Sequence, residues 1–123
     1  MFKVPFQDKR LKNKDEILAI RFLKDKKIAI SVKFLSKNPV YQKENFVVLT
    51  DSSSASRVYE VKDDVVFKKS KNDNFIIDQN NKTWEVNEDY ITSKEGKKFK
   101  RLGAHRAFWF GWHAANPNTE LIQ

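Results

Sequence analysis

The side chains best suited to bind a ligand gather in a polar loop in mid-chain and in a segment near the chain end. The end segment, "AHRAFWFGWHAANP", is predicted to be a helix over residues 104–116, since Gly103 precedes it and Pro117 follows it. At about 100° per residue, its polar groups share one stripe of that helix. The stripe consists of His105, Arg106, Trp109, His113 and Asn116.

This stripe combines an indole that can stack, a guanidinium that can pair with a carboxylate or phosphate, two imidazoles and an amide. It indicates a site for an anionic or aromatic ligand, and its simpler interpretation is a solvent-facing helix surface. The other side of the helix, with Phe108, Phe110 and Trp112, is expected to pack on a sheet. No metal site is predicted, because His105 and His113 are not one helical turn apart and no cysteine or nearby carboxylate joins them.

The mid-chain loop, "TDSSSASR", contributes Asp51, Ser52 and Arg57 to the candidate ligand-binding residues. The chain contains the serine, histidine and aspartate residues of a hydrolytic triad, but it lacks the Gly-x-Ser-x-Gly turn that exposes a nucleophile. Neither common phosphate-binding glycine loop is present either. The sequence therefore predicts no catalytic residues and no cofactor.

Short strands separated by polar turns dominate the rest of the chain. Residues 28–34 alternate apolar and polar, and they are expected to pair with residues 16–22 as a hairpin. Asn80 and Asn81 form a typical hairpin turn. Further strands are predicted at residues 45–50, 57–61, 64–69, 75–79 and 82–86, and an exposed connection at 90–102. The pattern predicts a mainly β single domain over residues 1–123: a compact antiparallel sheet, sandwich or open barrel with one C-terminal helix.

Composition narrows the classes of function. The net charge is +8, with nineteen lysines and five arginines spread among the acids, which favours a solvated basic surface over a nucleic-acid site. The absence of cysteine excludes disulfides, thiolate metal sites and thiol nucleophiles. No apolar run is long enough to span a bilayer, and residues 1–16 lack the pattern of a signal peptide. If the natural protein is exported, we expect its targeting segment to lie outside this sequence.

The C-terminal half resembles a known bacterial family. "NFIIDQNNKTWEV" followed by "GKKFKRLGAHRAFWFGWHAANPNTELI" is similar to the domain of unknown function 3179. The resemblance rests on Phe75, Asp78, Thr83, Trp84, Gly96, Leu102, Trp109, Trp112, Pro117 and Thr119. It implies a β-rich domain, often in exported or membrane-associated proteins, with no established reaction. Many members have a Tyr-Cys-Pro-x-Cys loop where this chain has "TDSSSAS", so a thiol or selenol redox role is not carried over.

Three hypotheses follow for function. The leading one is a non-catalytic binding or interaction module for an unknown small ligand or protein partner, which uses the loop 51–57 together with the polar stripe. The second is a degenerate enzyme-like domain that has lost a cysteine loop, which requires Asp51 to lie against His105 or His113 away from water. The third is polyanion or nucleic-acid binding through the lysine-rich surface.

Overall fold

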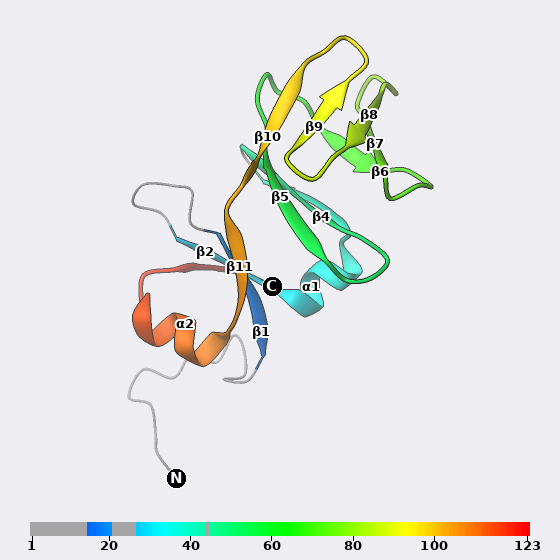
Figure 1. The fold of residues 1–123 in the computed structure, drawn as a ribbon. Coiled ribbons are helices and arrows are strands. Elements are labelled where there is room, and N and C mark those ends of the chain that lie inside the picture. The colour runs from blue at the N-terminus through cyan, green and yellow to red at the C-terminus, as the bar shows by residue number, and fades with distance from the viewer. Residues whose placement is uncertain (1–14, 21–26, 44) are drawn as a thin grey trace.

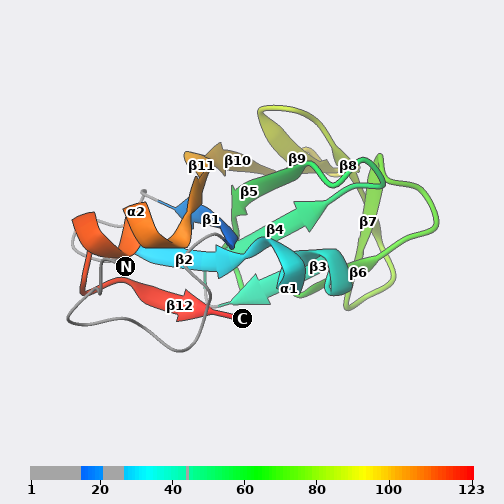
Figure 2. The same cartoon turned by 90° about the horizontal axis from the view of Figure 1, so that it is seen from below.

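The computed structural model describes residues 15–20, 27–43 and 45–123. These residues form twelve strands and two short helices, which confirms the mainly β prediction (Figure 1). Four strands make a small sheet in the order β11-β1-β2-β12, antiparallel except where β12 runs parallel to β2 (Figure 2). Its strands are β1 (Glu16–Ile20), β2 (Ile28–Ser31), β11 (Ala104–Phe108) and β12 (Glu120–Ile122).

The other eight strands form an antiparallel sheet in the order β3-β4-β5-β10-β9-β8-β7-β6. They are β3 (Val40–Lys43), β4 (Phe46–Thr50), β5 (Ser56–Glu60), β6 (Phe67–Lys69), β7 (Phe75–Asp78), β8 (Thr83–Val86), β9 (Tyr90–Ser93) and β10 (Lys98–Leu102). The edge strands β3 and β6 come together, so the sheet nearly closes into a barrel. Gln42 spans this seam: its Nε2 donates to the Val65 carbonyl (2.6 Å), and its Oε1 accepts from the Phe67 N–H (2.8 Å).

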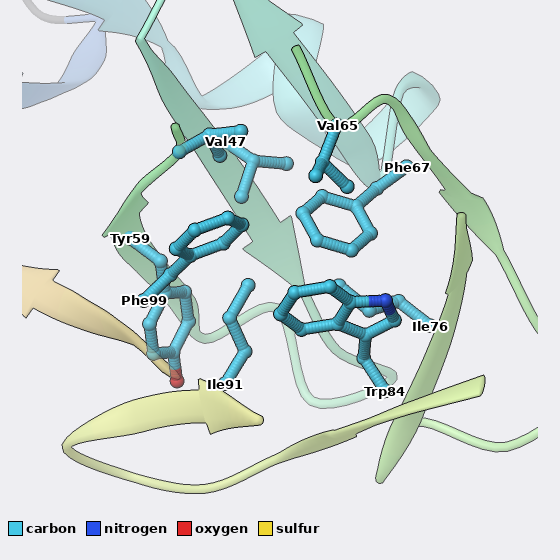
Figure 3. Close-up of a cluster of buried hydrophobic side chains, with 9 residues drawn as sticks. Val47, Tyr59, Val65, Phe67, Ile76, Trp84, Ile91 and Phe99 are labelled. Atoms are coloured by element: carbon cyan, nitrogen blue, oxygen red, sulfur yellow. The ribbon is translucent and has the colours of Figure 1, made fainter. Parts of the chain in front are cut away.

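Rings fill the interior of the barrel (Figure 3). Trp84 stacks on Phe99 with centroids 5.0 Å apart, and Phe67 meets Trp84 edge-on at 5.2 Å. These side chains come from strands distant in sequence, and aromatic pairs in such arrangements add to the free energy gained by burial. The barrel therefore has a packed core rather than an open channel.

The small sheet lies between the barrel and the second helix, α2 (Trp109–Ala115). One face carries Leu18 and Ile30 and packs against barrel strands, while the other carries Ile17 and packs against α2. The two sheets are joined directly where β10 runs through Gly103 into β11. No helix in the described part of the chain is long and apolar enough to cross a membrane.

Three sequence predictions are wrong in detail. The strand predicted at 28–34 ends at Ser31, and helix α1 (Val32–Lys37) follows it. Ser31 caps this helix, because its hydroxyl accepts a hydrogen bond from the Phe34 N–H (3.3 Å). The structure therefore has a second helix besides the predicted C-terminal one. The connection predicted at 90–102 contains β9 and β10. The helix predicted at 104–116 begins only at Trp109, because residues 104–108 pair with the edge of β1. Long-range strand pairing there overrides a helix-like local pattern. Residues 21 and 22 of the first predicted strand lie outside the described residues.

Candidate functional site

The serine loop, residues 51–55, joins β4 to β5 and is ordered by its own aspartate. One carboxylate oxygen of Asp51 accepts from the Ser53 hydroxyl (2.6 Å), the Ser53 N–H (2.9 Å) and the Ala55 N–H (3.1 Å). The bond from the Ser53 hydroxyl is the main reason that the pKa of Asp51 lies below its usual value. Ser54 takes a φ of 69° within this turn. Asp51 therefore shapes the loop.

This loop forms one rim of a pocket at the mouth of the barrel, and the turn from β6 to β7 forms the other. The rims touch where the Ser52 N–H donates to the Asp73 carboxylate (3.1 Å). The pocket holds about 40 Å³, which is room for a small chemical group. Its lining combines apolar side chains, including Leu49 and Ile76, with the charged side chains of Asp51, Arg57, Lys69 and Asp73, of which Lys69 and Asp73 are exposed.

Arg57 is the central polar side chain of this mouth. It lies on β5 two residues before Tyr59, so both side chains take the barrel face of the strand, and Leu49 is its partner on β4. Arg57 is half-buried and forms no close ion pair with any residue that the structure describes, and after the Ser53 hydrogen bond its charge also contributes to the lowered pKa of Asp51. Tyr59 is fully buried and donates its hydroxyl to the Asn87 carbonyl (2.6 Å), and burial raises its pKa.

Two residues of the predicted helix stripe do meet the serine loop, on its outer side. His105 and Arg106 lie on β11 and share an open groove with Ser53 and Ser54. The Arg106 guanidinium donates to the Ser54 carbonyl and lies 3.8 Å from the Glu16 carboxylate. The cation of Arg106 thus fastens the loop to the small sheet.

The remaining stripe residues lie elsewhere, and the predicted stripe does not exist as one surface. Trp109 is buried at 1% exposure and stacks on His113, with centroids 4.8 Å apart. Asn116 ends the helix, accepting from the Lys27 ammonium (2.5 Å) and donating to a helix carbonyl. The expectation that Trp109 faces a ligand is therefore wrong, and so is the burial expected for Phe108 and Phe110.

The reason is the phase of the short helix. Since α2 begins at Trp109, that residue and Trp112, one turn later, face the small sheet. Phe108 ends the preceding strand and is 62% exposed, and Phe110 is 40% exposed. Two large indoles, rather than the alanine-rich side, supply the buried face.

The enzyme-like hypothesis requires a carboxylate held against an imidazole. The Asp51 carboxylate accepts hydrogen bonds from the Ser53 hydroxyl and from the N–H groups of Ser53 and Ala55. In the described part of the chain, it makes neither a hydrogen bond nor an ion pair with His105 or His113. Among those same residues, no three histidine, aspartate or glutamate side chains lie close enough together to hold one metal ion.

Several residues that carry the family resemblance form the framework of the fold. The Trp84 indole N–H donates to Asp78 (3.0 Å), and the Trp112 indole N–H donates to Thr119 (3.0 Å). Gly96 takes a φ of 89° in the turn from β9 to β10, where a side chain would be strained. The chain matches the family described as "Protein of unknown function (DUF3179)" over residues 1–119.

It belongs to the DUF3179 family. No curated protein and no solved structure matches the chain. Within this DUF3179 domain, Asp51 and Arg57 of the predicted residues line the mouth, Ser52 bonds to Asp73 beside it, and the sequence analysis did not include Lys69 and Asp73 on the opposite rim. The signal available was Arg57 itself, a charged residue two positions before Tyr59 and therefore on the same face of the predicted strand.

Proposed function

We propose that this domain is a binding module that takes a small organic anion with an apolar body into the mouth of the barrel. The proposal is based on the position of the Arg57 side chain. This side chain is a half-buried cation on the barrel face of β5 that makes no close ion pair with a described residue, and Asp51 of the same mouth interacts with its charge only at longer range. A partly desolvated guanidinium is stabilised by a bidentate anion, and a carboxylate matches its geometry.

The surroundings of Arg57 favour an amphipathic ligand over a simple inorganic ion. Leu49 lies opposite Arg57 across the ladder, and Val40 lies opposite Leu49, so an apolar row begins beside the guanidinium. Ile76, which is buried on the barrel face of β7, continues this lining on the far rim. An apolar body seated against that row adds about 25 cal/mol for each Å² of its apolar surface removed from water.

The charges at the opening favour a small anion over a large one. Asp51 and Asp73 are committed to the two rims, each accepting hydrogen bonds from the serine loop. Their negative charge disfavours an extended polyanion at this opening, while Lys69 adds a second cation beside the mouth. The pocket of about 40 Å³ accepts a head group such as a carboxylate, with the rest of the ligand against the rim.

The test is a titration of the isotopically labelled domain with butyrate and benzoate, followed by amide chemical shifts. We expect saturable shifts at Leu49, Arg57 and Ile76. Arg57→Gln should weaken binding about tenfold or more, since hydrogen bonds to charged groups contribute about 1.5–3 kcal/mol. Arg57→Lys keeps the positive charge but loses the planar pair of N–H donors, so this variant should bind the anion with intermediate affinity.

Arg101→Gln is the matched control, because Arg101 is an exposed arginine on β10 that does not line the mouth. Shifts that do not saturate, or an equal loss of affinity in Arg57→Gln and Arg101→Gln, would contradict a binding site at the mouth.

A further inference from the structure

We propose that the outer face of the barrel sheet, over β7 to β10, is a docking surface for an acidic polypeptide segment that carries apolar side chains. Cross-strand register sets out this face. Lys98 lies opposite Thr92, Thr92 opposite Glu85, and Glu85 opposite Phe75, so the four share one row. The residue next to Lys98, Phe99, points into the barrel core and is 3% exposed, so the row faces outward.

Three lysines on this face are exposed and carry no ion pair with a described residue: Lys94, Lys98 and Lys100. Lysines at the nearby barrel end differ, since Lys82 pairs with Glu95 (2.7 Å) and Lys97 with Asp63 (2.9 Å). The unpaired cations thus gather on one side of the β9–β10 hairpin. Glu85 is the acid within the row, so the local charge is positive and complementary to an acidic partner.

The face also has an apolar depression beside these lysines. Phe75, Thr83 and Thr92 line it together with Lys94 and the stem of Glu85. A single apolar side chain of a partner fits such a depression, while carboxylates on either side reach the lysines. This combination favours a polypeptide of mixed acidic and apolar composition over a uniformly charged polymer.

The aromatic side chains of the face argue against single-stranded nucleic acid as the partner. Such ligands stack their bases on exposed rings. Here the Tyr90 ring is covered by the Lys98 ammonium, 4.6 Å from its centroid, and Phe75 is half-buried. Lysine also lacks the planar fork that reads bases and phosphates bidentately.

The test is fluorescence anisotropy of the whole chain with three labelled probes of equal length: alternating Glu-Leu, all-Glu and oligothymidylate. We expect the Glu-Leu peptide to bind most tightly. The variant Lys94→Gln, Lys98→Gln, Lys100→Gln should lose about tenfold in that affinity, as three exposed ion pairs predict. It should also show a shallower dependence of affinity on salt.

The control is Lys33→Gln, Lys37→Gln, Lys62→Gln, which removes the same charge from exposed lysines outside this face, two of which, Lys33 and Lys62, pair with Asp15 and Glu60. Its affinity should change less than about twofold, with unchanged circular dichroism in both variants. If the two variants lose the same affinity for the Glu-Leu peptide, the effect comes from net charge alone and the proposal is overturned. It would also be overturned by tighter binding of oligothymidylate, by all-Glu binding as well as Glu-Leu, or by no binding at all.

Discussion

The Trp84 indole N–H donates to the Asp78 carboxylate over 3.0 Å, within the hairpin that joins β7 to β8. The other carboxylate oxygen accepts from the N–H groups of Asn80 (2.8 Å) and Lys82 (3.0 Å). One buried carboxylate thus holds the turn, which includes Asn81 at a φ of 61°, and anchors the central ring of the barrel core. The hydrogen bond from Trp84 is the main reason that the pKa of Asp78 is lowered.

We therefore expect Trp84→Phe to raise the pKa of Asp78 toward its ordinary value. Because the folded-state pKa is depressed, the stabilisation is present above the unfolded pKa of about 4 and is lost as pH falls through the folded value. The unfolding free energy of the parent should fall more steeply with acid than that of the variant. Carbon-13 titration of the Asp78 carboxyl measures the shift, and urea unfolding at several pH values measures the stability.

Trp109→Phe is the control for this titration, because Trp109 is equally buried but packs in the separate cluster under α2. It should lower stability without moving the titration of Asp78. If the Asp78 midpoint is the same in Trp84→Phe as in the parent, the indole is not the cause of the lowered pKa.

The second indole bond closes the C-terminal segment. Trp112 donates to Thr119 (3.0 Å), and the Thr119 hydroxyl donates to the Lys27 carbonyl (3.1 Å), so it ties α2 to the start of β2. Thr119→Val keeps the shape and removes the hydroxyl, which should lower the unfolding free energy by about 1–3 kcal/mol. Thr119→Ser keeps the hydroxyl and should cost less, about 1 kcal/mol for the lost methyl group. Urea unfolding with tryptophan fluorescence measures both, and a Val variant as stable as the Ser variant would contradict this role.

Local pattern was sufficient for the strands whose own sequence alternates or is continuously apolar. Ile28 to Ser31 and Phe46 to Thr50 were predicted within a few residues, because both are short segments rich in apolar residues, and most of these residues are buried. The Asn80–Asn81 turn was predicted because asparagine tolerates positive φ. These features depend on residues adjacent in the chain.

The rest depends on partners that are distant in sequence. Whether residues 104–108 are strand or helix is decided by the backbone edge of β1, almost ninety positions earlier, through pairs such as Leu18 with Arg106. That pairing shifts the start of α2 to Trp109 and turns its indole inward. The candidate site changed for the same reason, since Arg57 is part of a mouth only because β6 and β7 curl round to face the serine loop.

Closure of the barrel makes a prediction that compares two glutamines. Gln42 bonds to the Val65 carbonyl and the Phe67 N–H, and Gln79 bonds to the Asp64 carbonyl (3.1 Å) and the Val66 N–H (2.8 Å). Both amides thus serve the same short segment with two bonds each. They differ in environment, since the bonds of Gln42 are partly buried and those of Gln79 are exposed to water.

We expect Gln42→Leu to lower the unfolding free energy by about 1–3 kcal/mol, because it leaves partly buried backbone groups without their partner. Gln79→Leu should cost well under about 1 kcal/mol, because water replaces the lost bonds. Hydrogen exchange gives a local readout: the Phe67 amide should exchange faster in Gln42→Leu and keep its parent rate in Gln79→Leu. Equal losses of stability in the two variants would mean that the seam is held by the packing of β3 against β6 and not by the Gln42 amide.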